Sequence, residues 1–320
     1  YTELLKEEIL FWKFCQYKFY EQWKFLKQYA NTRGIQIIGD IPLYMAMDSA
    51  DVWADRKLFL LEEDGSQQHV AGSPPDNFSE EGQKWGNPVY DYSYMEEHQF
   101  DWWRHRIEKN AALYDVIRID HFLGVVRYYT IPFQEKDCCN GKWNKGPGKK
   151  LTDVMEESAG DCRIIADNAG SAIAGSRKLL ARIGWPGSKI LMFAFDGNTG
   201  NENLPHNFEE NNIVVYTGTH DNDTVVGYFR DKTEYELAYL CEYLNIGSKE
   251  EIPDALIRLA YSSIADVVII PMQDILQLGN EARMNQPSTV GQNWKWRVGK
   301  DTLSEERRAW IRTIAAVYRR

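Results

Sequence analysis

The sequence lacks the patterns that mark a disulfide-stabilised or metal-binding protein. Its six histidines are scattered, and neither a Cys-x-x-Cys nor a His-x-His motif occurs, so it predicts no metal site. The cysteine count is odd and shows no framework spacing: Cys15, Cys138, Cys139, Cys162 and Cys241. These absences favour a reducing compartment, and we expect the protein to be cytoplasmic.

Two further absences restrict the partners. These 320 residues show no signal-peptide pattern and no apolar run long enough to span a bilayer. Basic residues are outnumbered, with 37 Lys and Arg against 47 Asp and Glu and a net charge of −10, which disfavours nucleic acid and anionic membranes as partners. The sequence begins at Tyr1 rather than at methionine, so we expect the native N-terminus to lie elsewhere.

What the sequence does contain is ordinary globular material. Its 320 residues are 43% hydrophobic and 26% charged, which is enough apolar material for one large domain or two smaller ones. Aromatic residues make up 13%. Flat rings suit the faces of sugars, but aromatic residues also fill cores, so this enrichment alone does not decide between the two uses.

The segment from Val116 to His121 combines a buried strand with charged residues at its end. Its branched apolar residues are typical of a strand in a parallel sheet. Because strand side chains alternate, Arg118 and Asp120 should point to the same side, where the guanidinium would lower the pKa of the carboxyl group. An ionised carboxylate there suits a nucleophile or a cation stabiliser, and the alternative is a structural ion pair.

Strand-like and helix-like segments alternate along the chain. Helical spacing predicts one long, well-buried helix over residues 3–29, either continuous or broken once, and further helices at 101–113, 176–183, 233–263 and from about 303. Polar residues follow the strands, as in a parallel α/β protein that is either a (β/α) barrel or an open doubly wound sheet. No G-x-G-x-x-G follows a strand, which disfavours a dinucleotide cofactor. The six predicted strands are residues 35–40, 116–121, 163–167, 189–196, 213–219 and 265–271.

Residues 45–100 are less regular and form an excursion from this alternation. Asp48 to Trp53 reads as a capped helix start, and residues 72–78 and 85–90 read as turn-rich loops. Long ordered loops are often functional, although a plain surface excursion remains an alternative. The Gly- and Lys-rich residues 140–148 lack the spacing of a phosphate-binding loop, so we interpret them as an ordinary loop.

Several longer motifs resemble one known family, the amylomaltases or disproportionating enzymes, which are 4-α-glucanotransferases related to α-amylases. The resemblance extends over nearly the whole chain, and the last two motifs are long and specific. The matching segments are Gly39-Asp40-Ile41-Pro42, Pro74-Pro75-Asp76, Trp85-Gly86-Asn87-Pro88, Arg118-Ile119-Asp120-His121-Phe122, Gly218-Thr219-His220-Asp221-Asn222-Asp223-Thr224 and Glu281-Ala282-Arg283-Met284-Asn285.

The resemblance implies a (β/α)8 barrel that performs retaining transglycosylation on α-1,4-glucans and maltooligosaccharides without a cofactor or metal. Asp120 matches the family's nucleophile, Asp221 its third carboxylate, and Arg118 and His220 its supporting residues. A retaining pair of carboxyl groups lies about 5–5.5 Å apart, so Asp120, Asp167 and Asp221 should meet at one mouth of the barrel. The residues that match glucan-binding segments are Asp40, Asp76, Gln83, Trp85, Asn87 and Asn285.

The sequence departs from the family at the acid/base. The family has Ile-Ala-Glu-Asp-Leu-Gly where this chain has Ile-Ala-Asp-Asn-Ala-Gly, so the glutamate is replaced by the shorter Asp167 and its neighbour by Asn168. The family's arginine after the His-Phe pair is Leu123 here. Because small misplacements of catalytic groups cost about 100-fold in rate, we expect reduced activity.

The second departure concerns length. Six of the eight strands are found, so we expect residues 1–320 to form a single barrel domain that lacks its first two strand–helix units, with a substrate-binding excursion at about 45–100. Three functions follow. The first is glucan transfer, and the second is glucan binding without turnover. The third, a metal-dependent hydrolase suggested by the polar run from His220 to Asp223, is disfavoured by the absence of spaced histidines.

Overall fold

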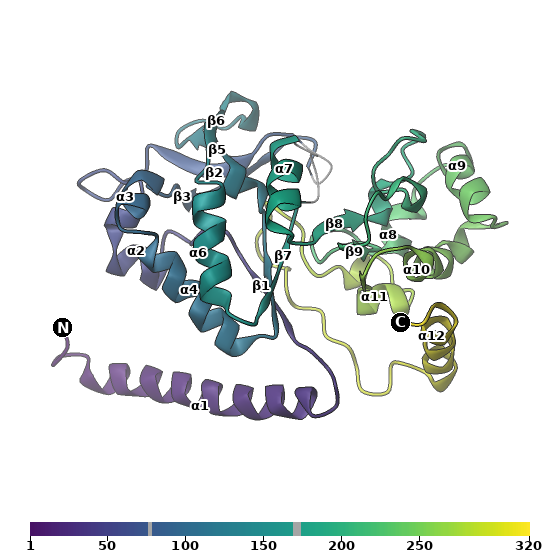
Figure 1. Cartoon of the computed structure of the whole chain (residues 1–320), viewed down its shortest axis with the longest axis horizontal. Helices are drawn as coiled ribbons and strands as arrows, with labels where there is room; N and C mark the ends of the chain where they lie inside the picture. Colours follow the sequence, from purple (N-terminus) through teal and green to yellow (C-terminus); the bar gives the residue numbers. More distant parts are fainter. Residues whose placement is uncertain (76–78, 169–173) are drawn as a thin grey trace.

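The structure is a computed structural model that describes residues 1–75, 79–168 and 174–320 (Figure 1). Its centre is a set of six parallel strands in two three-stranded sheets, ordered β1-β4-β7 and β10-β9-β8. Ala166 N–H donates to Pro186 O (3.0 Å) at the junction, so β7 lies next to β8. The six strands are β1 (Ile38–Ile41), β4 (Val116–Ile119), β7 (Arg163–Ala166), β8 (Gly187–Ile190), β9 (Ile213–Tyr216) and β10 (Val267–Ile269).

The six strands follow their order in the sequence, and all six predicted strands are confirmed within a few residues. All six are shorter than predicted, and every one except β1 ends before its predicted last residue. The strand predicted to reach Asp196 stops at Ile190, where a 3₁₀ turn over Leu191–Phe193 begins, so Asp196 does not follow a strand. Branched apolar residues explain the burial of β4 and β9, in which all four positions are buried. Among the described residues, β1 pairs only with β4, and β10 pairs only with β9.

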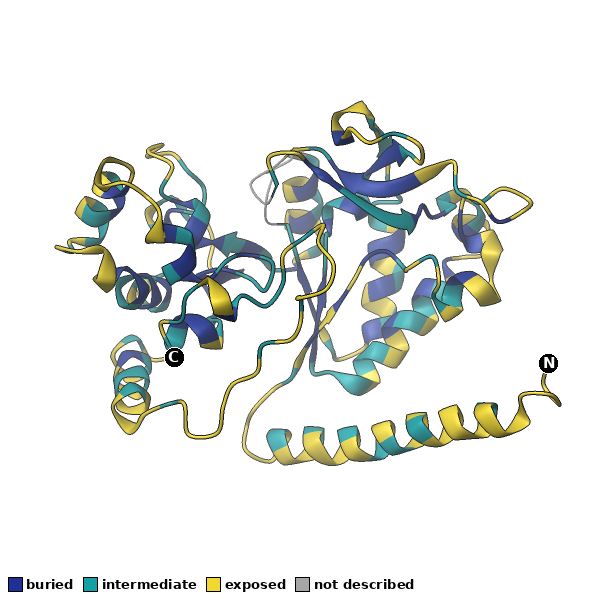
Figure 2. Ribbon diagram, turned by 180° about the vertical axis from the view of Figure 1, so that it is seen from behind, coloured by how far each residue is buried: buried dark blue, intermediate teal, exposed yellow. Residues whose placement is uncertain are grey.

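Helices pack around these strands (Figure 2), and the described residues form two large hydrophobic cores. One lies mainly on the β1-β4-β7 sheet, and the other lies mainly on the β10-β9-β8 sheet but also includes Val116 of β4 and Ile165 of β7. Leu151, Met155 and Ala159 recur at helical spacing on α6 and are buried, while Thr233 and Glu236 form a capping box that begins α9. The helices are α3 (Tyr92–Glu97), α4 (Asp101–Leu113), α5 (Leu123–Val126), α6 (Lys149–Ala159), α7 (Ala174–Ile183), α8 (Val225–Arg230), α9 (Glu234–Leu244), α10 (Ile252–Ser262), α11 (Met272–Ile275) and α12 (Glu305–Tyr318).

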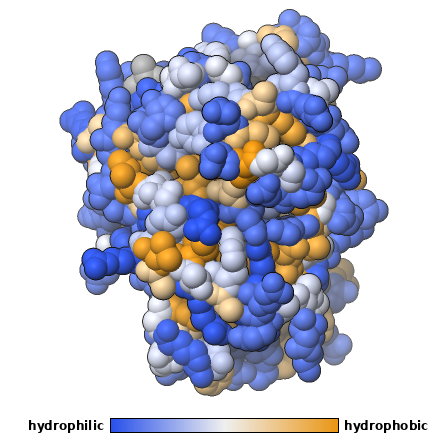
Figure 3. All heavy atoms as spheres, turned by 90° about the vertical axis from the view of Figure 1, so that its right-hand side faces the viewer, coloured by the Kyte–Doolittle hydropathy of each residue, from blue (hydrophilic) through white to orange (hydrophobic). Residues whose placement is uncertain are grey.

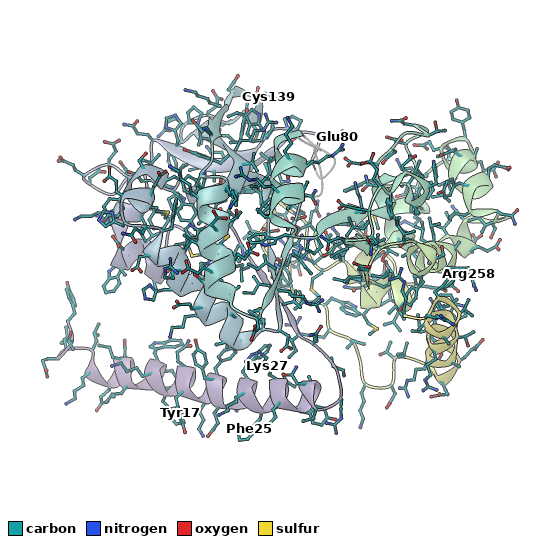
Figure 4. All side chains as sticks on the ribbon, in the orientation of Figure 1. Tyr17, Phe25, Lys27, Glu80, Cys139 and Arg258 are labelled. Atoms are coloured by element: carbon teal, nitrogen blue, oxygen red, sulfur yellow. The ribbon has the colours of Figure 1, made fainter. Side chains whose placement is uncertain are left out.

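The N-terminal helix corrects one expectation. Helix α1 (Lys6–Asn31) is long, as predicted, and continuous, but none of its residues is buried. It lies along one side of the molecule, with Lys27 directed toward the body and Phe25, 67% exposed, directed away (Figure 4). Trp23 Nε1 donates to Leu113 O (2.8 Å) and Lys27 Nζ to Tyr114 O (2.9 Å). Aromatic spacing predicts a helix but does not say which surface covers it.

An antiparallel sheet, ordered β3-β2-β5-β6, covers one end of the parallel strands. It comprises β2 (His69–Ser73), β3 (Gln83–Pro88), β5 (Arg127–Pro132) and β6 (Lys142–Lys145). The predictions of loops at 72–78, 85–90 and 140–148 are therefore wrong where they overlap β2, β3 and β6, because pairing between distant segments outweighs their local turn residues. The capped start is confirmed, since Ser49 caps α2 (Ala50–Ala54) and its side chain accepts from Val52 N–H.

The face formed by the C-terminal helices is mainly hydrophilic, with small apolar patches between polar groups (Figure 3). No helix in the described part of the chain combines the length and apolar character needed to cross a membrane. The short 3₁₀ turns are Arg56–Leu58, Cys138–Asn140, Leu191–Phe193, Pro205–Asn207, Lys249–Glu251 and Asn280–Ala282.

A close approach in β1 gives a testable consequence. A Cβ atom at Gly39 would lie 2.0 Å from Cδ2 of Tyr114, whose ring packs against Trp23 of α1. Gly39→Ala should therefore lower the free energy of unfolding by about 1–3 kcal/mol, as overpacking does, measured by urea denaturation. In a Tyr114→Ala background the same change should cost much less, and an equal cost in both backgrounds would contradict this packing explanation.

Candidate active site

One arginine joins the ends of three neighbouring strands. Arg118 of β4 is 6% exposed, and its Nη1 lies 2.7 and 2.6 Å from the two carboxylate oxygens of Asp40. The same nitrogen lies 3.1 Å from Asp120 Oδ1, and Nη2 lies 2.8 Å from Asp167 Oδ2. The predicted contact between Arg118 and Asp120 is confirmed. It is part of a larger array in which one cation faces three carboxylates.

The backbone fixes this array because the strand pairing continues past the strand ends. Asp120 N–H donates to Ile41 O and Asp167 N–H to Ile119 O, both at 3.0 Å. Phe122 N–H donates to Asp167 O at 2.9 Å, and His121 N–H donates to a carboxylate oxygen of Asp167 at 3.3 Å. The pairing register of β1 with β4 also contributes, because it places Asp40 directly opposite Arg118. The carboxylates therefore sit on a hydrogen-bonded backbone rather than on free loops.

The electrostatics of Asp120 differ from the sequence-based expectation. Its pKa is raised to about 8, first by removal from bulk water and then by the negative charge of Asp167, while Arg118 opposes the shift. Although 36% of the Asp120 side chain is accessible, that surface faces a cavity. The prediction of a lowered pKa was wrong because burial and the charge of Asp167 outweigh the effect of Arg118, whose single charge is shared among three carboxylates.

A second group faces the array from the segment after β9. His220 Nδ1 lies 3.8 Å from Asp40 Oδ2, and His220 Nε2 lies 3.6 Å from Asp221 Oδ2. Asn285 Nδ2 donates to Asp221 Oδ1 (2.6 Å), and Arg283 Nη2 donates to the backbone oxygen of Asp221 (2.8 Å). His220 thus links the two groups, with one carboxylate at each of its ring nitrogens.

A cavity of about 640 Å³ lies between the two groups. This volume is typical of small-molecule sites. Arg118 lies beneath it and lines a neighbouring cavity of about 380 Å³. Asp76 lies outside the described residues. Every other residue predicted for the site lines the larger cavity: Asp40, Gln83, Trp85, Asn87, Asp120, Asp167, His220, Asp221 and Asn285.

The side wall of the cavity is a strand where a loop was predicted. Trp85 Nε1 donates to Gln83 Oε1 (2.8 Å), and both residues belong to β3. The Trp85 ring packs edge-on against the ring of His121 at 4.8 Å. Asn87 Nδ2 donates to Met45 O (2.8 Å). The antiparallel sheet therefore holds these amide and aromatic groups in place.

Part of the cavity wall is formed by residues that the sequence motifs do not indicate. Tyr44, Asn293 and Trp294 line the cavity, and the Trp294 ring packs against the ring of His220 at 5.1 Å. Trp294 has a φ of 63°, which is unusual for a bulky residue. The aromatic run around Trp294 was the available signal, but residue type alone does not separate a cavity wall from a core. Within the described chain, no three His, Cys, Asp or Glu side chains are placed to hold a metal ion.

Comparison with known proteins agrees with these motifs. A family model for glycoside hydrolase family 77, described as 4-alpha-glucanotransferase, matches residues 1–302. The chain belongs to this family. It is 47% identical over 324 residues to a 4-alpha-glucanotransferase from Clostridium butyricum, covering 100% of this chain and 66% of that protein. A Thermus thermophilus 4-alpha-glucanotransferase is 43% identical over 317 residues, covering 97% and 63% respectively.

A solved structure extends the family assignment to the fold. The amylomaltase from Streptococcus agalactiae in complex with acarbose matches with a TM-score of 0.94 at 41% identity, covering 100% of this chain and 65% of that chain. The chain therefore has an amylomaltase-like α/β fold. It spans 66% and 63% of the length of the two 4-alpha-glucanotransferases above.

The raised pKa of Asp120 predicts how stability changes with pH. The folded value of about 8 lies above the ordinary value of 3.8, so the folded state holds a proton that the unfolded chain releases. The contribution of this group to stability is therefore greatest below about pH 4 and is lost as pH rises through about 8. Relative to the unsubstituted chain, Asp120→Asn should become progressively more stable over that range, measured by urea denaturation.

A matched control uses an aspartate outside the cavity. Asp231, with 85% of its side chain exposed, should show no such trend when it is replaced by asparagine. A stability difference for Asp120→Asn that stays constant from pH 4 to pH 9 would contradict the raised pKa.

Proposed function

We propose that this chain forms the catalytic part of a 4-α-glucanotransferase that acts by a retaining double displacement. The observation that carries the proposal is the array in which Arg118 holds Asp120 and Asp167 at one wall of a cavity, with Asp221 on the opposite group. Two carboxyl groups at one wall and a third facing them match the needs of retaining glycosyl transfer. Family membership supports the same reaction.

In the first step, Asp120 attacks the anomeric carbon of the donor glucan. The bond from that carbon to the glycosidic oxygen breaks, and Asp167 gives its proton to the departing oxygen. The products are a glucosyl ester on Asp120 and a shortened chain with a free 4-hydroxyl group. The raised pKa belongs to Asp120, so the step begins when the proton that the cluster keeps has passed from Asp120 to Asp167, which leaves Asp120 ionised as the nucleophile.

In the second step, the 4-hydroxyl group of another glucan replaces water as the acceptor. Asp167, now ionised, takes the proton from that hydroxyl group, which attacks the anomeric carbon and releases Asp120. Asp221 and His220 hold ring hydroxyl groups of the donor, and these contacts strengthen as positive charge develops on the sugar. No cofactor or metal takes part in either step.

The proposed substrates are α-1,4-glucans, including maltooligosaccharides, starch and glycogen. Trp85 gives the cavity an aromatic surface, and Gln83, Asn87 and Asn285 line it with amides that suit sugar hydroxyl groups. The solved amylomaltase that resembles this chain was determined with acarbose. A cytoplasmic location remains a prediction from composition.

A second function, glucan binding without turnover, is favoured by the position of Asp167. Its carboxylate is one methylene shorter than the family's glutamate and lies 2.8 Å from Arg118 and 3.3 Å from His121 N–H. Both contacts hold it at the strand end. Glucan binding with no change in chain length would distinguish this function from transfer.

We further propose that the parallel strands belong to a (β/α)8 barrel that two strand–helix units outside this chain close. The edges of β1 and β10 support this, as does the cavity of about 380 Å³ lined by Ile38 of β1 and Ile269 of β10. The exposed aromatic residues on α1 form an apolar surface that no other part of the described chain covers, which also supports further units packing there. The chain spans 66% and 63% of the length of the two relatives, so the remaining third of those proteins is long enough to contain both units.

Barrel closure predicts a difference in hydrogen exchange. In the 320-residue chain alone, edge amides of β1 and β10 should exchange quickly and the chain should aggregate readily, because unpaired edges template pairing. A protein that also carries the two proposed units should protect these amides. The central strands β4 and β7 serve as an internal control and should be protected in both. A monomeric 320-residue chain with protected edges would contradict closure by outside strands.

The acid/base assignment predicts a gain of activity. In a protein that carries the closing strands, Asp167→Glu should raise transfer from maltotriose by about 10²- to 10⁴-fold, the range ascribed to general acid–base catalysis. The longer side chain reaches the glycosidic oxygen, while glucan affinity should change little because the cavity wall is unaltered. Products are measured after separation by size.

Two controls accompany this substitution. Asp120→Asn should abolish transfer, and α-glucosyl fluoride, which needs no acid to leave, should respond less to Asp167→Glu than maltotriose does. If the rate does not change with Asp167→Glu while Asp120→Asn removes it, another group is the acid. If neither change matters, the binding function replaces transfer.

A further inference from the structure

One buried carboxylate fastens both ends of the segment that carries His220 and Asp221. Asp274 of α11 is 1% exposed. Its Oδ2 accepts from Thr217 Oγ1 (2.5 Å), where the segment leaves β9, and its Oδ1 accepts from Val225 N–H (2.8 Å), where α8 begins. The residues between these points, 217–225, are here called the site loop.

The chain that follows Asp274 reaches the tip of the site loop. Gln273 Nε2 donates to Ala282 O (3.1 Å), which joins α11 to the turn before Arg283. Arg283 then donates to the backbone oxygens of Asp221 (2.8 Å) and Asn285 (2.9 Å). Asn285 N–H in turn donates to His220 O (3.0 Å). The ends and the tip of the site loop are thus held by one continuous stretch, residues 273–285.

The carboxylate at position 274 is not explained by a contribution to stability. No cationic side chain in the described part of the chain pairs with Asp274, and burial raises its pKa to about 6, against two hydrogen bonds and with Asp223 adding to the rise. An unpaired buried charge costs stability. What the carboxylate does provide is two acceptor oxygens in one plane, each aimed at a different end of the site loop.

We propose that Asp274 is a positioning residue that sets the distance of Asp221 and His220 from the sugar by closing the site loop. The inference rests on the proposed transfer function. Asp120 and Asp167 are fixed by strand pairing, whereas Asp221 lies in a loop whose position depends on these hydrogen bonds. Because a shift of about 1 Å in such a group can cost about 100-fold in rate, closure of the loop bears directly on turnover.

The test removes one of the two hydrogen bonds by which Asp274 holds the ends of the site loop. It is made in a protein that also carries the two strand–helix units proposed to close the barrel. Thr217→Val keeps shape but loses the hydroxyl group that donates to Asp274. Thr152→Val is the matched control, because Thr152 is equally buried and its hydroxyl group also donates once, to Lys149 O within α6. At a temperature where both variants are folded, Thr217→Val should lower kcat about 10- to 100-fold, with KM nearly unchanged and Thr152→Val close to normal.

The choice of donor separates this defect from one in the acid. Asp221 acts on the sugar and not on the leaving group, so Thr217→Val should impair α-glucosyl fluoride as much as maltotriose. Thr217→Ser, which restores a hydroxyl group, should recover most of the activity. Equal kcat values for Thr217→Val and Thr152→Val, or a defect confined to maltotriose, would overturn the inference.

A double-mutant cycle tests whether the effect passes through Asp221. In an Asp221→Asn background, Thr217→Val should cause little further loss, since the group being positioned is already disabled. Fully additive losses would overturn the positioning role. If Asp221→Asn alone leaves transfer unchanged, the proposed function fails, a result distinct from equal activities of the two threonine variants.

Discussion

The site depends on a single guanidinium that is shared by carboxylates from three adjacent strands. Arg118 can contact Asp40, Asp120 and Asp167 together only because β1, β4 and β7 are parallel, adjacent and in register, so that their carboxyl ends meet. Three carboxylates this close would repel one another strongly without a cation among them. Strand order and electrostatics therefore constrain each other. The fold brings the three carboxylates together, and the positive charge of Arg118 offsets the repulsion between them.

Sharing also limits what the arginine does for each partner. Burial raises the pKa of Asp120, the charge of Asp167 raises it further, and Arg118, whose one positive charge is divided among three carboxylates, does not offset these effects. The sequence shows Arg118 and Asp120 two positions apart, which suggests an ion pair that involves only these two residues. Asp40 and Asp167, which lie 78 and 49 positions from Arg118 along the chain, change that conclusion. A cluster of this kind keeps one proton among its members, which is the state a retaining mechanism starts from.

What the sequence predicts well is local, and what it misses depends on distant pairing. Runs of branched residues ending in a carboxylate identify β4 and β7 because both signals lie within a few residues. The segments of β3 and β6 are predicted as loops from the sequence, because their Gly, Asn and Lys residues favour turns and the pairing with β2 and β5 is not visible locally. Most cavity residues came from family motifs and line one cavity, whereas Trp294 had no motif that set it apart. Nothing local marks Asp274 as the group that closes the site loop.

One wall of the cavity is formed by strand ends and carries Asp120 and Asp167, and the other is a loop that carries Asp221. The two walls differ in how easily their backbones can move, which determines how the short side chain of Asp167 can be compensated. Its N–H donates to Ile119 O and its carbonyl accepts from Phe122 N–H, so moving its backbone toward a sugar would break the pairing that holds Asp120 as well. Local backbone adjustment is therefore the costliest way to recover the missing methylene. A bridging water, or a donor seated deeper in the cavity, leaves this wall intact. Deeper seating would require Asp221 to follow the sugar. The wall that carries Asp221 is a loop held by side-chain hydrogen bonds. Such bonds break and re-form more readily than the backbone hydrogen bonds between paired strands.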